Sequence, residues 1–472
     1  MAEPAVLVLG AGPAGLGAAW KLRREKKASV TVLEQNTRVG GLAGWLEVGG
    51  QRVDFGSHRL HPACDASVLA DIRFLLGDDL LDRPRHGRIR LRGRWIHFPL
   101  KPVDLLVHLD PAFTAGSLLD RVRKSRYNGG GPESFASVLW SSLGPTICRE
   151  FYFPYARKIW GVDPAALSPI QAKRRVAASS FGKLMRKVMS SVPGLKPPGA
   201  GRFYYPRNGF GQISEVYAAA AEREGADLRL GWRVTSLDLD GGPKRWRITA
   251  ERDGEVAALD ADHVWSTVPV SLLSRLVRPA PPADVTDAAG AIDYRSIILV
   301  YLTLEAAQFT EYDAHYFPGP DIRITRLSEP KNYAGRSDPP DRTTLCAELP
   351  CGPDDDVWTM SDADLGRLVA ADLERAGVPV RVAIREVTTR RLRHAYPIYR
   401  HGYQFPLETL DRWIDSLPGF LSYGRQGLFA HDNTHHALYM AYAAVDCLNG
   451  EQFDRERWGR YREVFATHVV ED

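Results

Sequence analysis

A glycine-rich turn near the amino terminus constrains the fold of this chain more than any other feature of its sequence. An apolar run typical of a buried parallel strand, Val6–Leu9, leads into the pattern Gly-x-Gly-x-x-Gly at Gly10–Gly15. A helical pattern continues to about Arg24, and a second apolar run, Val30–Leu33, ends at Glu34. This order of elements, a strand, a glycine turn, a helix and a second strand that ends in an acid, occupies about 30 residues. It predicts a βαβ unit that binds a dinucleotide.

Each glycine of this turn has its own physical task. Gly10 permits the tight turn, Gly12 lets the backbone approach a pyrophosphate, and Gly15 lets the helix pack on the strand. The free N–H groups and partial positive charge at the helix amino terminus favour phosphate. Glu34 follows Gly15 by nineteen residues, where its carboxylate can accept the ribose hydroxyls. NAD and FAD share this fingerprint, so it does not distinguish them.

Composition restricts the class of protein further. The chain has 472 residues and is 44% apolar, enough for a large core and for roughly three domains of about 150 residues. The net charge is only +4 and is spread along the chain, so we expect no nucleic-acid partner. The five cysteines are odd in number and mostly far apart, which excludes a regular disulfide framework. The sequence contains no apolar run of about 18 residues and no signal-peptide pattern, so we predict a cytoplasmic protein without a membrane span.

Three later segments favour FAD over NAD. The segment Arg38–Ala43 resembles the second glycine motif of the glutathione-reductase-type FAD proteins. Asp54–His58 is similar to the segment that these proteins place beside the isoalloxazine, and Gly424–Phe429 resembles their final flavin motif. The three matches occur in the correct order along the chain. The resemblance therefore implies an FAD protein.

The same resemblance assigns residues to the cofactor. It implies non-covalently bound FAD, with NAD(P)H as a candidate source of reducing equivalents. The residues expected to contact FAD are Gly10, Gly12, Pro13, Ala14, Gly15, Glu34, Gln35, Gly40, Gly41, Leu42, Gly56, Ser57, His58, Val234, Arg425, Asn433 and Thr434.

Further motifs indicate a narrower family. They are Arg90–Pro99, Phe153–Trp160, Arg175–Ala178, Arg326 with Asn332 and Tyr333, His401–Tyr403, and Asn433–His436. Within the FAD superfamily these segments resemble the amine oxidase and protoporphyrinogen oxidase group. In their motifs they are most similar to UDP-galactopyranose mutase, particularly the eukaryotic type.

The resemblance implies a ring contraction of a nucleotide-activated sugar through N5 of reduced flavin, with cations around the leaving pyrophosphate. Arginine suits that task because its planar fork binds phosphate oxygens bidentately and stays charged. The candidate catalytic residues are His58, Arg326, Arg175 and Tyr403. The candidate substrate residues are Arg90, Tyr155, Trp160, Arg175, Arg326, Tyr403 and Arg425.

Departures from the family motifs leave other functions open. Phe429–Asp432 lacks the family's phosphate-contacting tyrosine, Asn433–His435 replaces Asn-Gln-Asp, and Asn208 replaces a glycine. An FAD oxidoreductase that removes a hydride from an amine, alcohol or ring C–H is the main alternative. A flavoprotein retained as a binding scaffold is a third. We expect no metal, because the adjacent His435 and His436 point about 100° apart on a helix.

The fold class that follows is α/β. We predict a glutathione-reductase-type FAD-binding Rossmann domain, a mixed-sheet substrate domain and a helical insertion. The FAD domain is assigned to residues 1–80, 202–280 and 415–472, the insertion to 103–200, and the substrate domain to 81–102 and 281–414. Within these domains, Leu228–Val234 is predicted to be one strand and Ala437–Leu448 the last helix.

Overall fold

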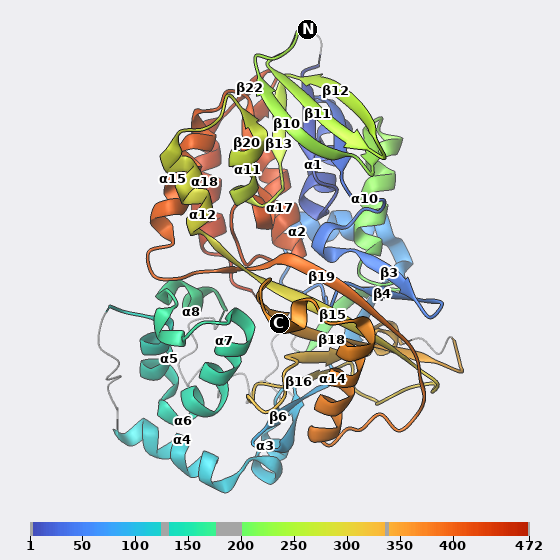
Figure 1. Ribbon diagram of the computed structural model, residues 1–472, viewed down its shortest axis with the longest axis vertical. Coiled ribbons are helices and arrows are strands. Elements are labelled where there is room, and N and C mark those ends of the chain that lie inside the picture. The colour runs from blue at the N-terminus through green and yellow to red at the C-terminus, as the bar shows by residue number, and fades with distance from the viewer. Residues whose placement is uncertain (1–2, 124–131, 176–200, 336–338, 471–472) are drawn as a thin grey trace.

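A parallel five-stranded sheet carries the glycine-rich turn. The structure, a computed structural model, describes residues 3–123, 132–175, 201–335 and 339–470 (Figure 1). The sheet has the order β20-β13-β1-β2-β9, and all its pairs are parallel. Its strands are β1 (Ala5–Leu9), β2 (Ser29–Glu34), β9 (Asp227–Leu230), β13 (His263–Ser266) and β20 (Phe420–Ser422). Three distant parts of the sequence therefore build one parallel sheet.

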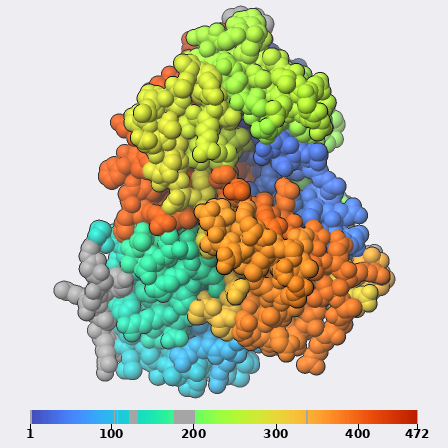
Figure 2. Space-filling view, viewed as in Figure 1, coloured from blue at the N-terminus to red at the C-terminus, as the bar shows by residue number. Residues whose placement is uncertain are grey.

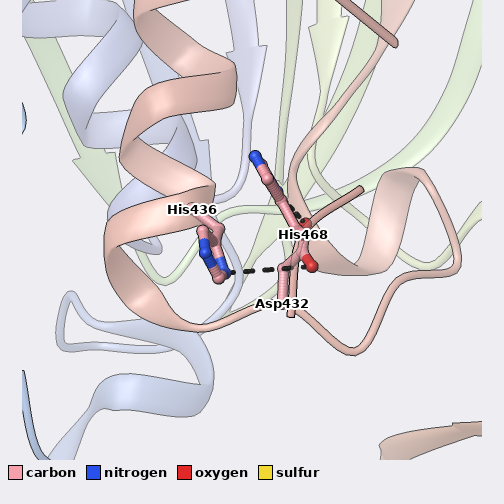
Figure 3. A group of neighbouring side chains, drawn as sticks. All are labelled: Asp432, His436 and His468. Atoms are coloured by element: carbon pink, nitrogen blue, oxygen red, sulfur yellow. Dashed lines mark hydrogen bonds and ion pairs between the residues drawn. The ribbon is translucent and has the colours of Figure 1, made fainter. Parts of the chain in front are cut away.

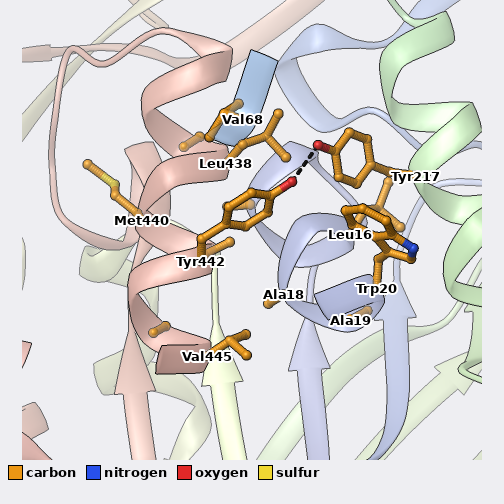
Figure 4. Close-up of a cluster of buried hydrophobic side chains, with 14 of the residues drawn as sticks. Leu16, Ala18, Ala19, Trp20, Val68, Tyr217, Leu438, Met440, Tyr442 and Val445 are labelled. Carbon is orange, nitrogen blue, oxygen red and sulfur yellow. Dashed lines mark hydrogen bonds between the residues drawn. The ribbon is translucent and has the colours of Figure 1, made fainter. Parts of the chain in front are cut away.

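Three helices, α1 (Pro13–Arg24), α10 (Gln212–Arg223) and α17 (Thr434–Asp446), pack together beside this sheet (Figure 4). Gly17 allows α1 to approach α17 closely, because a Cβ there would lie 2.8 Å from Leu438 Cδ2. The hydroxyls of Tyr217 and Tyr442 are hydrogen-bonded at 2.7 Å within this core.

A second, mixed sheet of order β12-β11-β10-β14 adjoins the first; β10, β11 and β12 are antiparallel, and β14 pairs with β10 in parallel. Its strands are β10 (Arg233–Leu239), β11 (Trp246–Arg252), β12 (Glu255–Ala261) and β14 (Val277–Arg278). The prediction of one strand over Leu228–Val234 is wrong, because the chain turns at Gly231, where φ is +79°. β9 and β10 consequently belong to different sheets.

The third sheet has seven strands in the order β19-β15-β18-β17-β16-β6-β7. Its strands are β6 (Gly87–Leu91), β7 (Arg94–Phe98), β15 (Asp293–Leu304), β16 (Ala314–Tyr316), β17 (Arg326–Ser328), β18 (Thr343–Cys351) and β19 (Ile384–Ile398). One face packs on helix α14 (Asp362–Arg375), and the other faces the hairpin of β3 (Trp45–Val48) and β4 (Gln51–Asp54). These strands lie in the two segments assigned to the substrate domain.

A group of helices lies beside this sheet, in teal and cyan in Figures 1 and 2. It contains α3 (Pro102–His108), α4 (Pro111–Arg123), α5 (Phe135–Leu143), α6 (Pro145–Ile147), a π-helical turn (Cys148–Tyr152), α7 (Phe153–Trp160) and α8 (Pro169–Arg175). The predicted helical insertion therefore forms, whereas its parts 124–131 and 176–200 lie outside the described residues.

Further elements connect the sheets. They are α2 (Ala66–Leu76), the antiparallel pair β5 (Leu80–Pro84) and β8 (Arg202–Pro206), α11 (Val270–Leu276), α12 (Ala283–Ala291), α13 (Pro330–Ala334), α15 (Gln404–Ser416) and α16 (Gly424–Gly427). None of the helices within the described ranges combines the length and apolar character needed to cross a bilayer.

The carboxyl-terminal region differs from the prediction. The helix expected at Ala437–Leu448 begins earlier, at Thr434, and it is not the last helix. The hairpin of β21 (Leu448–Asn449) and β22 (Gln452–Phe453) follows, and then α18 (Arg455–Ala466). Only Trp458 and Phe465 of α18 are buried. Two buried residues give too weak an apolar periodicity for the helix to be recognised in the sequence. The α/β class and the Rossmann-type domain are confirmed.

Candidate functional site

The two glycine motifs face each other and form a cradle. Gly12 ends the turn before α1 with φ of −80°, a value that any residue can adopt. A Cβ on Gly12 would approach no atom outside its own neighbours closer than 3.8 Å, the distance to Gly41 Cα. Neither backbone strain nor packing requires glycine there, so a ligand that approaches the backbone explains it. The cradle therefore fits the pyrophosphate of a dinucleotide.

Gly15 has a different task, as predicted from the fingerprint. A Cβ at this position would lie 1.9 Å from the carbonyl oxygen of Gly10, so glycine is required for α1 to pack against the turn. Gly10 itself has φ of +101°, a conformation that favours glycine. The amide of Gly40 donates to the carbonyl of Ala11 at 2.8 Å and joins the second motif to the first.

Glu34 lies at the end of β2 with 6% of its surface exposed. Its carboxylate accepts hydrogen bonds from the Ala11 amide at 2.9 Å and from the Asn36 amide at 2.9 Å. These bonds fix the carboxylate beside the glycine turn, where a ribose would bind. The backbone of Trp232 donates to the carbonyl of Glu34, which brings the turn before Val234 to the same place.

The segment expected beside the isoalloxazine lies between β4 and the seven-stranded sheet. His58 stacks on Phe210, and its Nε2 donates to the carbonyl of Phe55 at 2.8 Å, so its Nδ1 is the acceptor nitrogen. Burial lowers the pKa of His58, and the nearby carboxylates of Asp54 and Glu348 only partly oppose this shift. The imidazole is therefore neutral near pH 7.

Arg326 forms a buried ion pair with Glu348. Its Nε and Nη2 each donate to the carboxylate at 2.9 Å, and the amide of Ser57 donates to the same carboxylate at 2.9 Å. The side chains of Arg326 and Glu348 are 16% and 4% exposed. Burial opposes the charge on Arg326, but Glu348 together with the phenols of Tyr316 and Tyr396 outweighs it, and the pKa of the guanidinium is raised. Arg326 thus lies beside the flavin segment, with one edge of its fork already occupied.

A second buried pair, missed in the sequence, adjoins the first. Arg59 lies 3.3 Å from Asp313 and donates to the hydroxyls of Tyr316 and Tyr333 at 3.0 Å each. The hydroxyls of Tyr333 and Ser57 are also hydrogen-bonded to each other. The signal in the sequence was the position of Arg59 directly after the flavin segment. Glu348 offered another, as a single acid within the apolar run Thr343–Cys351.

Arg425 belongs to the final flavin motif, Gly424–Phe429. Its guanidinium donates to the carbonyls of Ala395 at 2.7 Å and Asp432 at 3.3 Å and lies 5.4 Å from the ring centre of Tyr396. The hydroxyl of Tyr396 also interacts electrostatically with Arg326. Arg326 and Arg425 are therefore brought together around one tyrosine. Asn433, which caps α17, follows directly.

Tyr403 belongs to a neighbouring aromatic group. It stacks on Tyr399 with ring centres 4.2 Å apart, and Arg174 donates to the Tyr399 hydroxyl at 2.9 Å. The side chain of Arg175, the predicted residue, lies outside the described part, whereas Arg174 was not predicted. Trp160 is 5% exposed in the core of the helical insertion, and its ring is nearly perpendicular to that of His431.

Two further predicted substrate residues, Arg90 and Tyr155, have neighbours of their own. Arg90 pairs with Asp321 at 2.6 Å and donates to the carbonyl of Arg375 at the end of α14. Tyr155 lies on α7, where its ring is 6.0 Å from that of Phe151. The substrate roles of Arg90 and Tyr155 stay predictions.

A histidine cluster lies at the start of α17 (Figure 3). Asp432 is 3.0 Å from His468 Nδ1 and 3.9 Å from His436 Nδ1, and the two imidazoles stack at 4.2 Å. The ligand atoms lie within 4.8 Å of one another, so a metal has to be considered. However, His436 Nδ1 accepts the Asn433 amide, and stacked rings do not direct their lone pairs at one ion. We interpret the cluster as a hydrogen-bonded attachment of the carboxyl-terminal segment.

The family of the chain follows from comparison with known proteins. A model of flavin-containing amine oxidoreductases matches residues 13–443, and the chain belongs to this family. The protein is therefore a flavoenzyme of the amine oxidase superfamily, which confirms FAD and the oxidoreductase superfamily inferred from the motifs.

Individual relatives differ in their activities. The chain is 30% identical over 321 residues to phytoene dehydrogenase of Streptomyces griseus, over 58% of this chain and only 57% of that protein. It is 26% identical over 330 residues to human protoporphyrinogen oxidase, covering 64% and 67%. A structure of reduced UDP-galactopyranose mutase superposes with a TM-score of 0.81 and 21% identity, covering 99% of this chain and 100% of the other. This last likeness establishes the fold alone.

Proposed function

We propose that the protein is an FAD-dependent enzyme that acts on a nucleotide-activated sugar, in the manner of a UDP-galactopyranose mutase. The observation that carries this proposal is the placement of Arg326 and Arg425 around Tyr396, between the two flavin segments. Guanidinium groups and phenols are the donors that suit a diphosphate next to a flavin. The full-length likeness to the mutase fold adds support.

The residues of the chain would divide the work as follows. Bound FAD, when reduced, would supply a nucleophilic N5 for the anomeric carbon of the sugar. Arg425 and the remaining Nη1 of Arg326 would hold the diphosphate as negative charge develops on it. His58, neutral and with Nδ1 as an acceptor, would hold a proton donor on the flavin side. The buried rings around Tyr399 would exclude water from this region.

The test compares the reduced and oxidised forms of the enzyme. Dithionite-reduced and air-oxidised protein are incubated with a panel of nucleotide sugars, and the products are separated by chromatography. The proposal expects a furanose product only from reduced enzyme, with no net consumption of reductant. NADPH replaces dithionite in a parallel arm, to test NAD(P)H as the reductant. An absence of product from every nucleotide sugar in the reduced form contradicts the proposal.

A second candidate is a net oxidoreductase. The named relatives that favour it, a phytoene dehydrogenase and a protoporphyrinogen oxidase, are closer in sequence than the mutase is. The charge-neutral Arg326–Glu348 pair is compatible with an uncharged substrate at the same place. Oxygen or acceptor consumption by oxidised enzyme with a porphyrinogen, polyene or amine substrate would support this candidate over the mutase.

A further inference from the structure

A pocket lies where the helical insertion meets the seven-stranded sheet. Its volume is about 730 Å³, within the roughly 300–1,000 Å³ typical of small-molecule sites. Its walls come from α7, from the loop 320–323, from the end of β18 and from the turn Asp356–Trp358. Figure 2 shows the helical insertion (teal) lying against the sheet domain (orange) on this side of the molecule.

The sheet separates this pocket from the flavin segments. Side chains alternate between the two faces of β18. Cys346 and Glu348 face the hairpin and flavin side, where Glu348 accepts the Ser57 amide. Leu349 and Cys351 are oriented toward α14 on the other face, and both line the pocket. The pocket is therefore distinct from the site built around Arg326.

Cations outnumber acids in the lining. Four are basic (Arg157, Lys158, Arg295 and Arg323) and two are acidic (Asp355 and Asp356). Arg295 lies 3.7 Å from Asp355, a long contact, and donates to the carbonyl of Pro350 at 3.4 Å. Its buried Nε has no hydrogen-bond partner among the described residues. A buried donor without a partner needs an explanation, and a bound acceptor provides one.

Lys158 brings a second partly buried cation to the same wall. Its Nζ donates to the carbonyls of Phe317 at 2.5 Å and Ile324 at 3.4 Å, which leaves the third N–H direction for another acceptor. Burial lowers the pKa of Lys158 to about 8. A nearby anion would favour its charged form.

The rest of the lining is apolar, and includes Pro320, Ile322, Leu349, Val357 and Met360. A small inorganic anion would leave this surface uncovered. An organic molecule with a charged end would cover the apolar wall and satisfy the cations at once.

We propose that this pocket binds an organic phosphate, with the phosphate on Arg295 and Arg323 and the organic body on Ile322, Leu349 and Met360. The phosphate could belong to a nucleotide or to a prenyl chain, since both offer the same anionic group. The inference goes beyond the proposed function, because the pocket lies on the opposite face of the sheet from the flavin segments.

The experiment measures ligand binding to FAD-loaded protein by calorimetry. The probes are UDP, geranyl diphosphate and inorganic pyrophosphate. Arg323→Glu is the main variant, because Arg323 is exposed and its substitution leaves the core intact. Arg295→Gln is the second variant, and Arg367→Glu, an exposed arginine on α14, is the matched control.

We expect at least one organic phosphate to bind more tightly than pyrophosphate. Its dissociation constant should rise about tenfold or more in Arg323→Glu and Arg295→Gln, and stay unchanged in Arg367→Glu. Binding should persist in Arg326→Ala, which tests the flavin-side site separately. Preference for UDP or for geranyl diphosphate identifies the source of the phosphate. The proposal is overturned if no organic phosphate binds at millimolar concentration, or if pyrophosphate binds equally well. It is also overturned if Arg323→Glu has no effect on binding, or if binding is lost only in Arg326→Ala.

Discussion

Alanine substitutions at Gly12 and Gly15 should separate cofactor binding from folding. At Gly12 a Cβ would meet the nearest atom at 3.8 Å, which is ordinary van der Waals contact, and φ is −80°. We therefore expect Gly12→Ala to change the free energy of unfolding of the apoprotein by less than about 1 kcal/mol. The methyl group would occupy the space that a pyrophosphate needs, so FAD affinity should fall by about tenfold or more, about 1.4 kcal/mol.

Gly15→Ala is the matched contrast. Its Cβ would lie 1.9 Å from the Gly10 carbonyl oxygen, about half of a normal contact distance, so the backbone itself must move. We expect a loss of about 3 kcal/mol or more in stability, at the upper end for overpacking. Urea denaturation of the apoproteins and fluorescence titration with FAD measure the two effects. Unchanged FAD affinity in a folded Gly12→Ala protein would refute the cradle assignment.

Further predictions concern buried charge. Arg326→Met should destabilise the protein by about 3–5 kcal/mol, because Glu348 is left unpaired, whereas Arg326→Met with Glu348→Leu should recover most of that loss in urea denaturation. Burial lowers the pKa of His315 from 6.5 to about 3, so its contribution to stability is complete above pH 6.5 and is lost as the pH falls toward 3. At pH 5 this loss of stability is about 2 kcal/mol relative to pH 7. In His315→Phe, the free energy of unfolding should fall by about 2 kcal/mol less between pH 7 and pH 5. An equal fall in the variant and the unmutated protein would contradict the reasoning. Glu34→Ala should weaken FAD by about 1–3 kcal/mol in a titration of the apoprotein, and an equal affinity would exclude it from the cofactor site.

The local parts of the fold could be predicted from the sequence. The βαβ unit depends on contacts between residues close in the chain, and its helix was correctly expected to reach Arg24. The hairpin of β6 and β7 is equally local, because a turn at Arg92 joins its two strands, and the segment Arg90–Pro99 was recognised through its resemblance to a family motif. Short-range spacing and turn chemistry determine such elements.

The polar network beside the flavin segment could not be predicted in the same way. Glu348 contacts Ser57 across 291 residues, and Arg59 contacts Tyr333 across 274 residues. The sequence shows that a buried acid needs a partner, but not which cation folding will bring to it. Arg326 was therefore assigned to substrate without its ion-pair partner. Its role toward a diphosphate stays a prediction.

The Arg326–Glu348 ion pair would reduce the electrostatic attraction between Arg326 and an anionic substrate. Because the carboxylate occupies Nε and Nη2, the pair is close to neutral, and a diphosphate would meet mainly the Nη1 edge and the surrounding phenols. Directional hydrogen bonds, rather than net charge, would then select the ligand. The same neutral pair also tolerates an uncharged substrate, which explains how one arrangement of residues is compatible with both mutase and oxidase relatives. If the proposed function holds, the groups around Tyr396 would select the substrate, whereas the flavin cradle would serve the cofactor alone.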